Sequence, residues 1–316
     1  MGTGEVSGRE HEYDLVVRGE RVLVAGGEHP REVGVVGGVV RAIEPLGAGL
    51  DGERVVELGP HQVLVPGLVD THVHVNEPGR TEWEGFASAT RAAAAGGVPT
   101  LVAVGRPWRA PRGAGEARGA GQKVARDQAF VDVGFWGGAV PGNADELRPL
   151  WDAGVFGFKC FLLHSGVEEF GYLEPDELEA DLRLLADFDG LMLVHAEDSR
   201  AIERAPTPHG DHYDTFLASR PRGAENVAIA AVIEAARWTG ARAHVLHLSS
   251  SDALPMIRSA KREGVRLTVE TCPHYLALAA EEIPDGATQF KCCPPSREID
   301  NRELLGVGLL AGPGGG

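Results

Sequence analysis

From residue 63 onward the sequence alternates short apolar runs with longer segments of helical pattern, and this rhythm restricts the possible folds more than any other feature. Apolar runs such as VFGFKCFLL and LMLVHAED are typical of buried strands, and segments such as PDELEADLRLLADF and ENVAIAAVIEAARWTG are typical of helices. Strands that alternate with helices build a parallel sheet, because each crossover helix returns the chain to the same edge. At this length the alternation predicts a (β/α)8 TIM-like barrel.

The first 62 residues follow a different pattern. Short β-type runs, YDLVVRG, RVLVAGG, EVGVVGG and VVRAIEP, each end in glycine or a polar turn, which indicates hairpins. We therefore predict a small β subdomain over residues 1–62 and the barrel over residues 63–316. The printed sequence ends at GLLAGPGGG after roughly six strand–helix units, so we expect the barrel to be incomplete at the C-terminus and to lack its last strands.

Residues 105–122, GRPWRAPRGAGEARGAGQ, interrupt the alternation where the end of a strand and a helix are due. This glycine, arginine, alanine and proline mixture has no apolar period, while the text on both sides of it keeps the strand and helix pattern. A locally shifted reading frame would produce such a patch between intact flanks. Resequencing the coding region tests this hypothesis, and an undisturbed frame would refute it.

Charge and hydropathy exclude several classes of partner. The 316 residues carry a formal net charge of -16 spread along the chain, so we expect binding neither to nucleic acid nor to an acidic membrane surface. No stretch approaches the roughly 18 apolar residues of a membrane span, and the N-terminal segment lacks the apolar core of a signal peptide. We expect a cytoplasmic protein with reduced cysteines that acts on a small molecule.

Two histidines follow the first apolar run of the barrel region, in the segment DTHVH. His72 and His74 are two residues apart, so in a strand their side chains lie on the same face. At the carboxyl end of a barrel strand this face borders the mouth where TIM barrels hold their active sites. The pair therefore favours metal ligation over two incidental polar residues at the rim.

Two later apolar runs also end in histidine, at His195 in LMLVHAED and at His247 in HVLHLSS. His244 lies three residues before His247, so the strand period places it on the opposite face, and we interpret it as a packing residue. Lys159 lies within the apolar run GVFGFKCFLL, where burial would make its amine lose its proton readily. The alternative for Lys159 is a side chain that extends to solvent.

The segments DTHVH, GFKCFL, VHAED, VLHLSS and CPHYL together resemble the cyclic amidohydrolases, a family that includes dihydropyrimidinase, dihydroorotase and allantoinase. The resemblance covers about residues 13–303 apart from the divergent segment. Within the family, HVNEPGRTEWEGFASAT, VDVGFWGGAVPGN and FKCCPP are similar to the allantoinases. Dihydroorotases carry an arginine for the substrate carboxylate two residues after the histidine pair, where this chain has Asn76.

The resemblance implies a hydrolase that opens the cyclic amide of allantoin to allantoate in purine catabolism. It implies two zinc ions bridged by a carboxylated Lys159, with His72 and His74 on one ion and His195 and His247 on the other. The catalytic residues would be His72, His74 and Lys159, because the two metals activate the attacking water and polarise the ring carbonyl. A homotetramer is the implied assembly.

The resemblance assigns the substrate to Asn76, Cys292 and Cys293. In the family a further aspartate, in a DHSP-like motif after the last strands, binds metal and transfers the proton to the leaving nitrogen. The printed sequence ends before such a motif, so two alternatives to an active allantoinase stay open. One is a cyclic amidohydrolase of the dihydropyrimidinase or hydantoinase type, and the other is a catalytically impaired, truncated member of the family.

Overall fold

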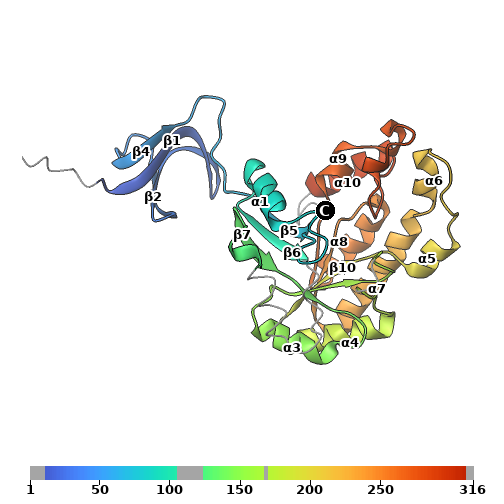
Figure 1. Ribbon diagram of the computed structural model, residues 1–316. Coiled ribbons are helices and arrows are strands. Elements are labelled where there is room, and N and C mark those ends of the chain that lie inside the picture. The colour runs from blue at the N-terminus through green and yellow to red at the C-terminus, as the bar shows by residue number, and fades with distance from the viewer. Residues whose placement is uncertain (1–10, 105–123, 167–169, 311–316) are drawn as a thin grey trace, which may run out of the picture. The chain divides into compact units, whose positions relative to one another are not determined.

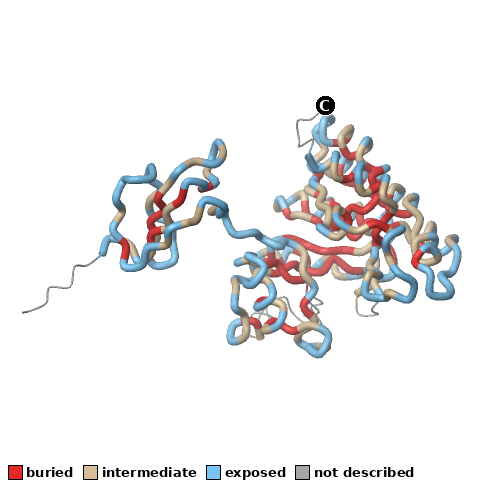
Figure 2. The backbone as a smooth tube through the Cα atoms, turned by 90° about the horizontal axis from the view of Figure 1, so that it is seen from above, coloured by how far each residue is buried: buried red, intermediate tan, exposed pale blue. Residues whose placement is uncertain are grey.

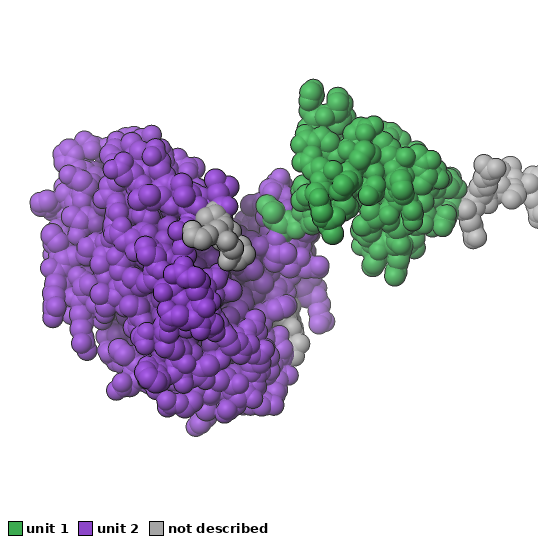
Figure 3. Space-filling model, turned by 180° about the vertical axis from the view of Figure 1, so that it is seen from behind, with its two compact units in different colours: residues 1–68 green, residues 69–316 purple. Residues whose placement is uncertain are grey.

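The protein is described by a computed structural model that covers residues 11–104, 124–166 and 170–310 (Figure 1). The divergent segment 105–122 lies outside these ranges. The chain forms two compact units, Met1–Leu68 and Val69–Gly316 (Figure 3). The first unit continues past residue 62, because Leu64 forms a parallel bridge with Val22 and exchanges backbone hydrogen bonds with Arg21 and Leu23.

The first unit is a four-stranded sheet of order β3-β2-β1-β4. Its strands are β1 (Tyr13–Val24), β2 (Gly27–Val36), β3 (Val39–Pro45) and β4 (Gly52–Glu57). Antiparallel pairing joins β1 to β2 and β2 to β3, and β4 pairs parallel to β1. The tight turn between β2 and β3 uses Gly37 and Gly38 with positive φ, a conformation that glycine adopts without steric cost. The predicted hairpins are confirmed.

The second unit is built on parallel strands in two sheets, of order β5-β6-β7 and β12-β11-β10-β9-β8. The strands are β5 (Val69–His74), β6 (Thr100–Val104), β7 (Asp132–Phe135), β8 (Gly137–Gly138), β9 (Phe158–Phe161), β10 (Leu191–His195), β11 (Arg242–Val245) and β12 (Leu267–Val269). Only Trp136 separates β7 from β8, so one strand pairs first with β6 and then with β9. The described strands of this unit therefore occupy seven successive positions, one more than the sequence count predicted.

The strand order describes an open barrel. Among the described residues, no backbone ladder joins the two outer strands, β5 and β12. A side-chain hydrogen bond of 3.1 Å from Thr71 Oγ1 on β5 to Glu270 Oε2, just after β12, connects the two edges. The predicted incomplete (β/α)8 barrel is thus the architecture of the described chain.

Helices follow the strands in the sequence. They are α1 (Phe86–Ala95), α3 (Ala144–Asp152), α4 (Pro175–Ala186), α5 (Ser199–Arg204), α6 (Tyr213–Ala218), α7 (Arg222–Thr239), α8 (Leu254–Arg262), α9 (Pro273–Ala277) and α10 (Ile299–Leu310). Pro175 opens α4 and Gly240, with φ of 70°, ends α7, as the sequence signals for helix ends predict. Among the described helices, none combines the length and the apolar character needed to cross a membrane.

Strand alternation divides the core of the second unit in two. Phe158, Cys160, Met192 and Val194 belong to the large cluster that packs against the helices, where most buried residues lie (Figure 2). The alternate residues, such as Leu193, form a smaller apolar cluster on the inner face of the strands. This period of two decides which polar side chains enter the barrel interior.

Candidate metal centre

Four strands deliver the five predicted metal ligands to the carboxyl ends of the sheet. His72 and His74 lie at the end of β5, Lys159 on β9, and His195 at the end of β10. Lys159 is paired in register with Leu193, so it shares the inner face with that residue and, two positions on, with His195. His247 follows β11 by two residues.

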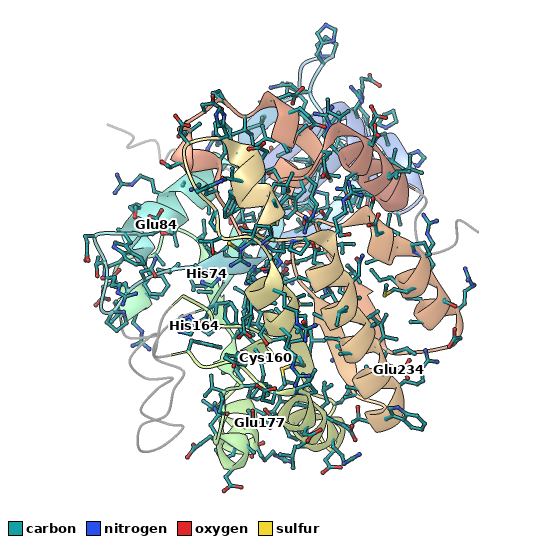
Figure 4. The ribbon with its side chains drawn as sticks, turned by 90° about the vertical axis from the view of Figure 1, so that its right-hand side faces the viewer. His74, Glu84, Cys160, His164, Glu177 and Glu234 are labelled. Carbon is teal, nitrogen blue, oxygen red and sulfur yellow. The ribbon has the colours of Figure 1, made fainter. Side chains whose placement is uncertain are left out.

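The five side chains form one cluster. Ring centroids lie 5.1 Å apart for His72 and His74, 5.4 Å for His72 and His247, and 4.6 Å for His195 and His247. The Lys159 Nζ atom lies 3.4 Å from His72 Nε2. Figure 4 shows the place of His74 among the side chains of the second unit. The structure therefore brings together every residue that the sequence nominated for metal binding.

His247 reaches the cluster in a way that the strand period does not predict. The sequence argument placed His244 and His247 on opposite faces of one strand, which is wrong because β11 ends at Val245. His247 then adopts a left-handed backbone with φ of 39°. His244 pairs in register with Leu193, and its ring contacts Thr268 Oγ1 at 2.7 Å and Glu270 Oε2 at 3.2 Å, which fits a packing residue.

Burial keeps the cluster largely unprotonated. It lowers the pKa of Lys159, which is fully buried, to about 7. Burial also lowers the pKa values of His72, His195 and His247 well below the usual range of histidine, and the nearby Lys159 charge acts in the same direction. Desolvation by the protein and the Lys159 charge lower the pKa of His74 to about 4, although the β5 edge keeps this residue open to solvent. Neutral imidazoles offer lone pairs to a metal.

The five side chains fit a metal ion, but they include no anionic ligand. His247 Nδ1 is buried without a hydrogen-bond partner among the described residues, and such an orphaned nitrogen is what a metal would occupy. Within the same described ranges, however, no three His, Cys, Asp or Glu side chains are already grouped as a complete ligand set. The set of four imidazoles and one amine contains no anionic ligand of its own.

Glu197 is a site residue that the sequence reasoning missed. Its carboxylate is buried, and Oε2 lies 2.8 Å from His195 Nε2 and 2.6 Å from Arg220 Nη1. Carboxylates that hold the second nitrogen of a ligating histidine fix the orientation of its ring. The spacing of Glu197, two residues after His195, was a usable signal, whereas Arg220 lies on a distant segment and gave none.

The predicted substrate residues lie in different surroundings. Asn76 follows β5, and its backbone closes a turn through hydrogen bonds with Glu84 and Arg80. Cys292 is half-buried, with Sγ 3.5 Å from His274 Nε2. Cys293 is exposed and lies close enough to Glu197 and Arg220 for their charges to influence its thiol. The two cysteines are therefore near the partner of His195.

Residues 63–288 match the model of the amidohydrolase family, whose members generally depend on metals. The chain is 54% identical to the allantoinase of Streptomyces avermitilis over 302 residues and 47% identical to that of Saccharomyces cerevisiae over 254 residues. These alignments cover 95% and 79% of this chain, and 68% and 55% of the respective relatives.

Solved structures agree on the fold. The L-hydantoinase of Arthrobacter aurescens superposes with a TM-score of 0.84 at 28% identity, over 93% of this chain and 66% of that protein. A D-hydantoinase gives 0.81 at 25% identity, over 92% and 65% of the two chains. The chain thus spans about two thirds of the length of these structures and, with the family match and the identities above, it belongs to the amidohydrolase family, on its allantoinase branch.

Proposed function

We propose that the protein is an allantoinase, a metal-dependent hydrolase that opens the cyclic amide of allantoin to allantoate. The reaction adds one water across a ring carbon–nitrogen bond and leaves a carboxylate and an N–H group. The observation that carries the proposal is the cluster of five basic side chains at the strand ends, three of them buried, where barrel enzymes hold their active sites. The allantoinases of Streptomyces avermitilis and Saccharomyces cerevisiae support the choice of substrate.

The cluster would hold two zinc ions. His72 and His74 would bind one ion, His195 and His247 the other, and Lys159 would bridge them. A buried lysine with a pKa of about 7 has a large neutral fraction at neutral pH, so its amine can add carbon dioxide and release a proton. The resulting carbamate would supply the anionic ligand that the set lacks. When bound, the metals would activate water and polarise the substrate carbonyl.

The substrate would lie between the metals and the loop of Cys292 and Cys293. Asn76 would present both a donor and an acceptor to the amide ring, and it lacks the charge that a ring carboxylate would require. Location in the cytoplasm and assembly into a homotetramer are also proposed, the first as the composition leads us to expect and the second on the family resemblance alone. The amphibian relative is named as a mitochondrial allantoinase, so the location needs its own measurement.

Two other functions have specific support. A hydantoinase or dihydropyrimidinase activity is suggested by the solved neighbours, which are less similar to this chain, at 25–28% identity, than the allantoinases. A catalytically impaired member is suggested by the predicted ligand set, because its four imidazoles and one amine include no anionic metal ligand of their own.

Ring opening of allantoin, hydantoin and dihydrouracil by the purified chain separates the three functions. The protein should be loaded with Zn²⁺ or Co²⁺ in bicarbonate, with Lys159→Ala as the control. We expect kcat/KM for allantoin to exceed the others by about tenfold or more and to vanish in the control. Preference for hydantoin or dihydrouracil would favour the second function. Metal binding without hydrolysis of any ring would favour the impaired member.

A further inference from the structure

We propose that Arg297 is a positioning residue that holds the two loops carrying His195 and His247 in the arrangement that a metal ion requires. This inference rests on the proposed function, because it assigns a task to a residue outside the ligand set. Arg297 follows the loop of Cys292 and Cys293, and only 3% of its surface is exposed. No motif in the sequence singles it out.

The three nitrogen groups of the Arg297 guanidinium contact three different segments. Its Nε donates to Ser249 Oγ at 3.0 Å, its Nη1 to the carbonyl of Arg220 at 2.8 Å, and its Nη2 to Glu225 Oε2 at 3.0 Å. A guanidinium has a planar fork of donors, so these contacts fix the three partners relative to one another. A lysine ammonium in the same place could not reproduce this geometry.

The first branch of the network leads to His247. Glu225 Oε1 accepts the backbone N–H groups of Ser249 and Ser250 at 2.7 and 3.1 Å, and Oε2 accepts the Ser249 hydroxyl at 2.6 Å. These contacts lie immediately after His247, whose left-handed backbone is uncommon for a residue with a side chain. Such a conformation persists when the surrounding structure over-determines it. Arg297 and Glu225 supply this constraint.

The second branch leads to His195. Arg297 binds the backbone of Arg220, and the Arg220 side chain binds Glu197, which contacts His195 Nε2. Both branches therefore end on the two histidines assigned to the same metal ion. His72 and His74 lie on β5, and the Arg297 contacts described above do not include that strand. A positioning role thus predicts an unequal effect on the two metal sites, whereas a purely structural role predicts no such difference.

The test compares two variants of the full chain with two matched controls. Arg297→Lys keeps the positive charge and loses the planar set of guanidinium donors. If this variant fails to fold, the double variant Arg297→Met, Glu225→Gln replaces it, because it removes both buried charges and leaves neither one unpaired. The controls are Arg302→Lys, at a half-buried arginine of α10, and Glu234→Gln, at an exposed carboxylate of α7. Figure 4 labels Glu234. Circular dichroism melting establishes which proteins are folded.

The first measurement is titration with Co²⁺, followed by absorption and calorimetry. We expect one of the two affinities to fall by about 10- to 100-fold in the folded Arg297 variants, while the other stays within about twofold of the wild-type value. The controls should leave both unchanged. Equal affinities in the wild type and in the folded variants, or an equal loss at both sites, would overturn the proposal.

The second measurement needs no metal, so it separates this proposal from the proposed function. Nitrogen-15 spectra of the histidine rings in the metal-free protein should show shifted resonances for His195 and His247 in the Arg297 variants, with His72 and His74 unchanged. If the wild type binds no metal, the proposed function fails, and the ring spectra still decide the positioning role. Unchanged His195 and His247 resonances would refute it.

Discussion

Two buried polar regions lie next to each other in the second unit, and they are organised in opposite ways. Around Arg297 and Glu225, a buried guanidinium faces a buried carboxylate, and both carboxylate oxygens are satisfied by several donors. Around Lys159, the five predicted metal ligands are all basic and contact one another, and the buried Glu197 carboxylate contacts His195 from outside this set. His247 Nδ1 has no hydrogen-bond partner in the described part of the chain.

The difference separates groups that hold the structure from groups that await a ligand. Burying a polar group without a partner costs free energy, so a fold keeps such groups only where they serve another purpose. The hydrogen-bonded network of Arg297, Glu225 and Ser249, which we call the satisfied network, stabilises the loops beside the strand ends. The five predicted metal ligands around Lys159, which we call the unsatisfied cluster, lower the stability of the metal-free protein. We propose that metal binding offsets this free-energy cost.

The largest effect should follow from breaking the satisfied network. In Glu225→Ala, Arg297 loses its buried carboxylate, and the free energy of unfolding should fall by about 3–5 kcal/mol because an unpaired charge remains buried. Urea denaturation measures the change. Glu234→Ala on the exposed side of the same helix should cost less than about 1 kcal/mol. Similar losses in the two variants would remove the distinction between the regions.

The opposite sign is expected when the unsatisfied cluster loses its amine. Burial lowers the pKa of Lys159 from 10.5 to about 7, so between these values the unfolded chain binds more protons than the folded chain, and folding is penalised below pH 10.5. Replacing the amine by an apolar side chain of similar length, in Lys159→Met, removes this penalty. The free energy of unfolding of the metal-free protein should rise by on the order of 4 kcal/mol at pH 7 and by less than about 1 kcal/mol at pH 10.

Denaturation of the wild type and Lys159→Met across this pH range gives the comparison, since groups common to both proteins cancel. A destabilised variant at pH 7, or a difference that grows with pH, would show that the amine is already stabilised by partners.

The sequence predicts only part of this contrast, because it records contacts between residues that are near one another along the chain. The β-strand period and the apolar runs placed His72, His74 and His195 at strand ends and Lys159 within a strand. The structure gathers these side chains, while their role in metal binding stays a prediction. The path of His247 was not predictable, because its left-handed turn begins where β11 ends.

The satisfied network was invisible to the sequence for a different reason. Arg297 is separated from Ser249 by 48 residues and from Arg220 by 77, so no local spacing records these contacts. Side-chain contacts between residues far apart in the sequence are therefore what the sequence alone does not predict.

The smallest effect concerns a buried carboxyl outside both regions. Burial raises the pKa of Asp181 on α4 from 3.8 to about 6, so the folded chain binds more protons than the unfolded chain between these values, and stability is lost as pH rises through 6. Asp181→Asn should stabilise the protein by about 1–2 kcal/mol at pH 8, with the gain shrinking toward pH 4. Thermal melts at both pH values check this, and a loss of stability at pH 8 would show that the carboxylate has a favourable partner.

The central claim is that the unsatisfied cluster is a metal centre, and metal stoichiometry tests it most directly. The purified chain would be loaded with Zn²⁺ in bicarbonate, desalted, and its metal content measured by mass spectrometry beside that of Lys159→Ala. We predict close to two zinc ions per chain in the wild type, and a loss of at least one in the variant because the bridging group is gone. A wild type that retains no zinc, or a variant that retains as much as the wild type, would contradict the account.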